Sequence, residues 1–151
     1  MEAHNQFQRK GLRVRSYGVG TKVRLPGPTA QNVFDFGTPY TRIKEVVKGT
    51  DYDWYNERGL VSMLTRNVRL KLAPERWQDI ETSLVQQFAV VFCYEERVFD
   101  ILVEDVRDNR EQDDMLVVNV VNLDVKDNPE AAVVGAQVSL EFCQLASAAV
   151  A

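Results

Sequence analysis

The alternation of apolar and polar residues predicts a first helix and then a short strand. Ala3 and Phe7 lie one helical turn apart, and Gly11 is a typical C-terminal stop. Leu12–Tyr17 alternates apolar and polar residues, as a half-buried strand does. A loop is expected as far as the cluster Leu25–Pro28, because glycine and proline interrupt both kinds of element.

Two helices are predicted in the next third of the chain. Thr38 is suited to be an N-cap ahead of Pro39 at the first helical position, and apolar residues then recur with the period of a helix that Gly49 ends. A second helical stretch covers about residues 51–66 and carries aromatic and aliphatic side chains.

The second half of the chain predicts strands separated by a helix. Phe88–Tyr94 is a continuous apolar run, which is typical of a parallel strand buried on both faces. A helix is expected from Glu95 to about Val106, followed by a charged surface loop up to Asp114. A second buried strand, Met115–Val121, comes next.

A final helix is predicted to begin at Asn128 and Pro129 and to run towards Ala148, since a capping residue followed by proline favours a helix start. Apolar residues recur along one of its faces: Val134, Val138, Phe142 and Leu145. The order of strands and helices predicts an α/β fold with a doubly wound, mostly parallel sheet. In such sheets ligands bind at the carboxyl ends of the strands.

Composition supports one globular domain, residues 1–151, because 45% of the residues are apolar and 26% are charged. No continuous apolar run approaches the roughly 18–20 residues of a transmembrane helix, and the N-terminus lacks the apolar core of a secretory signal. We therefore expect an intracellular protein without a membrane partner. Two cysteines and one histidine are too few for a disulfide framework, a zinc site or a choice of Ser-His or Cys-His pairs.

The net charge of −4 is distributed unevenly along the chain. Residues 1–76 hold 14 basic and 7 acidic side chains, whereas residues 77–151 hold 4 and 15. Solvated faces are the favoured interpretation of this asymmetry. The basic segments Arg9–Arg15 and Arg66–Lys71 lack interleaved aromatic residues, so we expect no direct binding of nucleic acid.

Candidate chemistry lies just beyond the last predicted strand. Asp124 and Asp127 follow its carboxyl end, where a carboxylic acid could protonate a leaving oxygen. From spacing alone, a role of Asp127 as the cap of the following helix is favoured over this chemical role. Cys93 and Cys143 are expected to be structural, and His4 is expected to be either exposed or a packing residue.

Several motifs, in one order along the chain, resemble the Ssu-seventy-two phosphatases. The resemblance runs from Met1 to about Leu145 and implies a fold similar to that of the low-molecular-weight tyrosine phosphatases. It also implies a nuclear enzyme that removes phosphate from the fifth-position serine, before a cis proline, of the RNA polymerase II heptad repeats. Symplekin and the cleavage and polyadenylation machinery of messenger-RNA 3′-end processing are the implied partners. The motifs are Met1–Asn5, Val14–Gly18, Lys22–Pro28, Pro74–Arg76, Glu95–Asp100, Val120–Asp124 and Asp127–Asn128.

The resemblance assigns roles to two groups of residues. Asp127 would be the general acid that protonates the serine leaving group, and Asp124 would shape the same loop. The resemblance implies no cofactor and no metal ion. Six residues would line the groove for the proline-containing peptide: Leu25, Pro26, Gly27, Pro28, Tyr55 and Met63.

The family's nucleophile has no counterpart in the 151 residues. Family members carry a central strand and a loop of pattern Cys-x-x-x-x-x-Arg-Ser ahead of the position of Met1, and neither Cys93 nor Cys143 is followed by arginine at the sixth position. We therefore expect these residues alone to be inactive, and the missing strand and phosphate loop to be encoded upstream of the Met1 codon. The family's acidic C-terminal extension is also missing after Ala151. A decayed gene copy is the alternative origin, and a non-catalytic module that binds symplekin or a proline-rich peptide is the alternative function.

Overall fold

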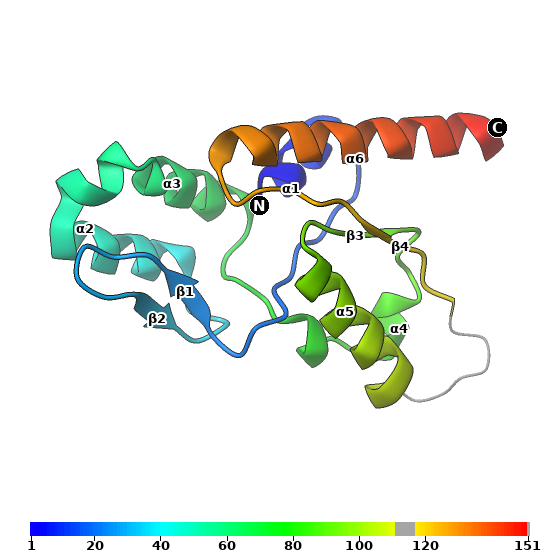
Figure 1. Ribbon diagram of the computed structural model, residues 1–151, viewed down its shortest axis with the longest axis horizontal. Helices are drawn as coiled ribbons and strands as arrows, with labels where there is room; N and C mark the ends of the chain where they lie inside the picture. The colour runs from blue at the N-terminus through cyan, green and yellow to red at the C-terminus, as the bar shows by residue number, and fades with distance from the viewer. Residues whose placement is uncertain (111–116, 151) are drawn as a thin grey trace. The chain divides into compact units, whose positions relative to one another are not determined.

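The computed structural model describes residues 1–110 and 117–150 (Figure 1). Its contacts divide the chain into two compact units, one of residues 1–15 and 77–151 and one of residues 16–76. The single domain expected from composition stays a prediction. The first unit holds α1 (Glu2–Arg9), α4 (Thr82–Val85), β3 (Val91–Cys93), α5 (Glu96–Glu104), β4 (Val120–Asn122) and α6 (Pro129–Val150), and the second holds β1 (Val23–Leu25), β2 (Asn32–Phe34), α2 (Tyr40–Glu57) and α3 (Leu60–Leu70).

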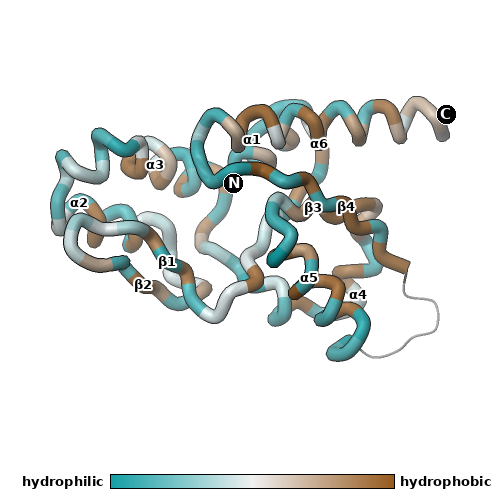
Figure 2. The backbone as a smooth tube through the Cα atoms, viewed as in Figure 1, coloured by the Kyte–Doolittle hydropathy of each residue, from teal (hydrophilic) through white to brown (hydrophobic). Residues whose placement is uncertain are grey.

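The first unit contains a parallel pair of strands, as the apolar runs predicted. Val91 of β3 is in register with Val120 of β4, and Cys93 is in register with Asn122. Figure 2 shows both strands as hydrophobic. The pair connects through α5, and α1 packs against α6 in the same unit. The α/β class is confirmed, while the absence of a central strand stays a prediction.

The strands are shorter than the sequence predicted. Phe88 belongs to the turn that follows α4, where its N–H donates to the carbonyl of Val85 at 3.1 Å, so the ladder begins only at Val91. The second predicted strand is paired at 120–122, and residues 115–116 of that prediction lie outside the described residues. An apolar run indicates burial, whereas a strand also needs a hydrogen-bonded neighbour along its length.

The strand predicted for Leu12–Tyr17 is wrong. Val14 is half-buried between two exposed arginines, but Leu12 is 40% exposed and Ser16 is half-buried, so the alternation describes burial only around Val14. The segment has no ladder, however, and only the residue after it, Gly18, forms an isolated bridge, with Arg76. Among the described residues, the segment therefore belongs to neither sheet.

The second unit has its own core, made by α2, α3 and the antiparallel hairpin of β1 and β2. Leu25 and Phe34, one on each strand of the hairpin, pack against this core. The two ends of the unit lie together, since the Gly18 N–H donates to the Glu75 carbonyl and Lys71 Nζ donates to the Ser16 carbonyl. The core residues are Tyr40, Ile43, Val47, Tyr55, Val61 and Leu64.

The helix breaks in this unit differ from those predicted. Gly49 is helical, and the kink falls at Asp51 (φ −162°, ψ 88°), whose Oδ1 accepts the N–H of Trp54 at 3.0 Å and so starts the next turn. Gly59 adopts φ 72°, a left-handed conformation that glycine tolerates, and it divides the predicted stretch 51–66. The cap also differs, because Pro39 occupies the N-cap position predicted for Thr38.

Helix α6 packs with a face other than the predicted apolar stripe. Gly135, Ala136, Ser139 and Leu140 are buried, whereas Val134 is 57% exposed and Leu145 is 73% exposed. Small residues allow close approach of helix backbones, and α1 contacts α6. Val134, Val138, Phe142 and Leu145 lie on one face of the helix, as predicted, but within the described residues that face is largely exposed.

Helix α6 is also unusually long and apolar. By length and composition alone, Pro129–Ala149 could cross a membrane, and 22% of its most apolar window is buried within the protein. Its two glutamates interrupt any continuous apolar run, which is why the pattern of residues predicted the opposite. Core helices of soluble proteins pass the same test.

Candidate active site

The loop that carries Asp124 begins at the carboxyl ends of the parallel strands. After β4, the Leu123 N–H donates to the carbonyl of Cys93 at 2.8 Å, and the Val125 N–H donates to the carbonyl of Tyr94 at 3.2 Å. The loop thus follows the end of β3 for two more residues. Asp124 is exposed between the half-buried Leu123 and Val125, so its carboxylate faces solvent. We call residues 123–127 the acid loop.

Asp127 is not the cap of α6. Asn128 performs that function, because its Oδ1 accepts the N–H of Ala131 at 2.8 Å and its carbonyl accepts the N–H of Ala132 at 3.0 Å. Asp127 is exposed, and its carboxylate makes no hydrogen bond within residues 1–110 and 117–150. The interpretation favoured from spacing is therefore wrong, and the Asp127 side chain has no structural task in the described part of the chain.

The two cysteines lie in the same unit but are poorly suited to attack phosphorus. Cys93 is 2% exposed, and burial raises the pKa of its thiol to about 11. Burial also raises the pKa of the half-buried Cys143 thiol. Since the thiolate is the nucleophile, both groups are unreactive near neutral pH. Cys93 is buried and structural, as expected, and His4 is buried as a packing residue.

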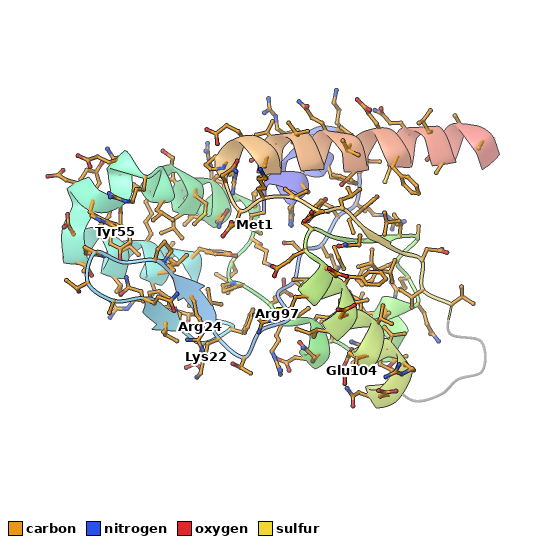
Figure 3. The ribbon with its side chains drawn as sticks, viewed as in Figure 1. Met1, Lys22, Arg24, Tyr55, Arg97 and Glu104 are labelled. Carbon is orange, nitrogen blue, oxygen red and sulfur yellow. The ribbon has the colours of Figure 1, made fainter. Side chains whose placement is uncertain are left out.

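The second unit holds the proline-containing loop Leu25–Pro28. Gly27 has no room for a side chain, since a Cβ there would lie 2.0 Å from the Ala30 carbonyl oxygen and 3.1 Å from the Tyr55 hydroxyl. Tyr55, marked in Figure 3, is 0% exposed, and its hydroxyl accepts a hydrogen bond from Nδ2 of Asn32. Tyr55 therefore supports the loop from within the core.

The structure brings together most of the residues expected in the peptide groove. Leu25 and Met63 are half-buried against the same core as Tyr55, and Gly27 approaches the Tyr55 hydroxyl. Their role in peptide binding stays a prediction. Asn32 was not singled out from the sequence, because 23 residues separate it from Tyr55 and no motif relates the two.

Asp124 and Asp127 belong to the first unit, whereas Leu25–Pro28, Tyr55 and Met63 belong to the second. Within the described residues, no group of three or more His, Cys, Asp and Glu side chains could hold a metal ion. The first unit offers two exposed carboxylates, Asp124 and Asp127, beyond a parallel strand pair, a place where α/β proteins bind ligands.

These features define an α/β protein with an acidic loop at the carboxyl end of its parallel strands, and comparison with known proteins identifies its family. A model of the family described as Ssu72-like protein matches residues 1–150. The chain belongs to the Ssu72 family.

Relatives in the family are similar along nearly the whole chain. The SSU72 phosphatase of Danio rerio, named for its action on the C-terminal domain of RNA polymerase II, is 42% identical over 146 residues, which are 95% of this chain and 73% of the relative. The protein of the same name from Dictyostelium discoideum is 40% identical over 149 residues, which are 96% of this chain and 68% of the relative.

Solved structures of the family share the fold. Drosophila melanogaster Ssu72, bound to symplekin and to a cis peptidomimetic of the C-terminal domain phosphorylated on the fifth-position serine, is 40% identical with a TM-score of 0.86. It is matched by 95% of this chain over 73% of its own length. A second Ssu72 structure, from work on C-terminal domain modifications that tune Ssu72 phosphatase activity, has a TM-score of 0.87 at 41% identity, with the same coverage.

Proposed function

We propose that this chain is the body of a protein phosphatase that removes phosphate from serine in the C-terminal heptad repeats of RNA polymerase II. The observation that carries the proposal is family membership over residues 1–150, in a family whose relatives are named as phosphatases of the C-terminal domain of RNA polymerase II and whose Drosophila melanogaster member is named as a serine phosphatase. The fifth-position serine before proline is the proposed target, since the related Drosophila protein binds such a peptide in the cis form. The enzyme would act in the nucleus, on transcription and messenger-RNA processing.

Asp127 is the proposed general acid. In a cysteine-dependent phosphatase the thiolate forms a bond to phosphorus while the serine oxygen leaves, and this oxygen needs a proton because an alkoxide is a poor leaving group. Asp127 is exposed, next to a capped helix start, and is not used for capping. Water then hydrolyses the cysteinyl phosphate, with the Asp127 carboxylate accepting the proton.

The peptide would lie along the loop Leu25–Pro28. The rigid Pro26 and Pro28 rings flank Gly27, and the buried Tyr55 hydroxyl and Asn32 support the loop. Such a fixed loop loses little conformational freedom when a proline-containing peptide binds. Symplekin is the proposed protein partner, because the related Drosophila protein binds it.

The proposal predicts a strong effect of Asp127→Asn. Residues 1–151 contain no Cys-x-x-x-x-x-Arg sequence, so we expect them alone to be inactive. In a protein extended at its N-terminus by that loop from a relative, Asp127→Asn should lower hydrolysis of a phosphoserine-proline peptide by about 10²–10⁴-fold, the usual contribution of a general acid. Phosphate release from the peptide measures the effect.

Lys126→Gln is the matched control, because it changes an exposed neighbour in the same loop and should leave the rate within about threefold, as surface changes usually do. Activity of residues 1–151 that depends on Asp127 would overturn the expected inactivity. An active extended protein that is unaffected by Asp127→Asn would overturn the role of this residue.

A non-catalytic interaction module is the second candidate function. It is favoured by the braced Leu25–Pro28 loop in a chain whose two cysteines are not followed by the phosphate-binding arginine. Residues 1–151 should then retain symplekin or a proline-rich peptide without hydrolysing any phosphate. If residues 1–151 fail to retain symplekin in a pull-down in which a longer relative succeeds, they are not a symplekin-binding module.

A further inference from the structure

We propose that Gly135 of α6 is a positioning residue for the acid loop, and that its lack of a side chain sets the place of Asp127. The inference rests on the proposed function, because it concerns the residue to which the proton transfer is assigned. It adds a determinant in the helix behind the loop, eight residues from Asp127 in the sequence.

The contact between the acid loop and α6 is made by Val125. A Cβ at position 135 would lie 2.6 Å from Val125 Cγ2 and 3.3 Å from Cγ1. Carbon atoms in contact normally lie about 3.5–4.0 Å apart, so the Val125 side chain occupies the space that any other residue at 135 would need. Val125 is half-buried, whereas Asp124 and Lys126 on either side of it are exposed. The valine is therefore the inward anchor between the two carboxylates.

Two further ties make the anchor rigid. The Val125 N–H donates to the carbonyl of Tyr94, which fixes the backbone of the same residue whose side chain meets Gly135. The Tyr94 hydroxyl lies 2.8 Å from Ser139 Oγ, and Ser139 Oγ donates to the Gly135 carbonyl at 2.9 Å. Tyr94 thus connects the loop backbone to the helix turn that contains Gly135.

A methyl group added to α6 at position 135 would therefore displace the acid loop. Ser139 is fully buried and Gly135 is buried, and α6 is held by its packing on α1, so the helix yields less readily than the exposed loop. Relief of the 2.6 Å contact requires a shift of roughly 1 Å to reach ordinary contact distance. A misplacement of about 1 Å can lower a catalytic rate by about 10²-fold.

The test compares two substrates in the extended protein that carries the nucleophile loop. Loss of general acid catalysis slows release of a serine alkoxide far more than release of an aryl oxide, which leaves without a proton. Gly135→Ala should lower hydrolysis of the phosphoserine-proline peptide by about 10–100-fold and that of p-nitrophenyl phosphate by less than about threefold. Gly49→Ala is the matched control, since Gly49 is also helical and a Cβ there meets nothing within 4 Å.

A rescue experiment separates positioning from general damage. Val125→Ala alone loosens the anchor and should lower peptide hydrolysis by about three- to tenfold, and this variant also keeps the test open if Gly135→Ala does not fold. The double variant Gly135→Ala with Val125→Ala should match Val125→Ala alone, since the shortened side chain leaves room for the new methyl. Far-UV circular dichroism verifies that each variant is folded.

The outcomes distinguish the inference from the proposed function. If Asp127→Asn discriminates between the two substrates while folded Gly135→Ala does not, the positioning role is overturned and the function stands. Equal loss of both substrates in Gly135→Ala, or a double variant that is as slow as Gly135→Ala or slower, also overturns it. If Asp127→Asn fails to discriminate, the proposed acid itself is wrong.

Discussion

At the level of single residues, burial decides which polar groups are available for chemistry. The Cys93 thiol is enclosed at the end of β3, and burial raises its pKa from 9.0 to about 11. Asp127 is exposed beside the first turn of α6, and the neighbouring Asn128 is the N-cap of this helix. The candidate acid is therefore accessible to a substrate, while the strand cysteine contributes to packing.

The raised pKa of Cys93 predicts a loss of stability in alkaline solution. A thiol that titrates higher in the folded state stabilises the fold below the unfolded pKa of 9.0, and this contribution disappears as the pH rises towards about 11. Each pKa unit corresponds to about 1.4 kcal/mol, so the free energy of unfolding should fall by about 2–3 kcal/mol across this range.

Urea unfolding at several pH values measures this change. Cys93→Ala should flatten the difference between pH 9 and pH 11, although burial also raises the pKa values of Tyr40 and Tyr94 and leaves some dependence in the variant. An identical pH dependence in Cys93→Ala and the unchanged protein would show that the thiol titrates normally.

At the level of a single element, α6 has a capped start and two very different faces. The cap belongs to Asn128, whose side chain bonds to the Ala131 N–H. The buried face carries small residues and Leu140, and the opposite face carries exposed valines, Phe142 and Leu145. Phe142 still contacts Phe92 of β3, with ring centroids 5.6 Å apart, so one residue of the exposed stripe packs on the sheet.

The cap assignment predicts a difference between two adjacent residues. Asn128→Ala should lower the free energy of unfolding by about 1 kcal/mol, because the first turn of the helix loses a hydrogen-bond acceptor. Asp127→Ala should change the free energy of unfolding by less than about 0.5 kcal/mol, because its side chain is exposed and has no hydrogen-bond partner among the described residues. Chemical denaturation of the two variants measures both losses. A larger loss of stability in Asp127→Ala than in Asn128→Ala would mean that Asp127 is the cap.

The two faces of α6 also predict opposite sensitivities. Leu140→Ala should cost about 2–4 kcal/mol, because it removes buried methyl groups from a packed face. Leu145→Gln should change the free energy of unfolding by less than about 0.5 kcal/mol, because this side chain is already largely exposed. Thermal and urea unfolding of both variants measure the difference, and a large loss in Leu145→Gln would mean that the stripe is covered.

At the level of the folded chain, a buried ion pair joins distant parts of the first unit. Asp105 Oδ2 accepts the Nε1–H of Trp77 and the Nε–H of Arg110, each at 2.9 Å. Arg110 also donates to the carbonyls of Ile80 and Trp77, at 2.8 and 3.0 Å. Both charged residues are nearly fully buried, and their partners lie up to 33 residues away in the sequence.

The buried pair predicts a large penalty for removing one partner. Asp105→Ala should lower the free energy of unfolding by about 3–5 kcal/mol, because Arg110 is left as an uncompensated buried charge. Asp108→Ala is the matched control, since Asp108 pairs only with its exposed neighbour Arg107 among the described residues, and we expect no measurable loss there. A similar stability of the two variants would show that solvent reaches Arg110.

Elements with local signals could be predicted from the order of residues. The start of α6 follows from Asn128 and Pro129, the end of α1 from Gly11, and the parallel strands from apolar runs whose burial needs no particular partner. The ordered motifs of residues 1–145 also identified the family and the loop containing Asp124 and Asp127.

Which of these residues meet one another follows from the packed fold alone. The alternation of Leu12–Tyr17 did not reveal that this segment lacks a ladder, and the stripe Val134–Leu145 did not reveal which face of α6 is buried. The contact of Val125 with Gly135 and the bond of Asn32 to Tyr55 join residues on different elements. Periodicity indicates that one face of an element is apolar. Which other element packs against that face depends on how the chain folds back on itself, and this is a property of the tertiary structure.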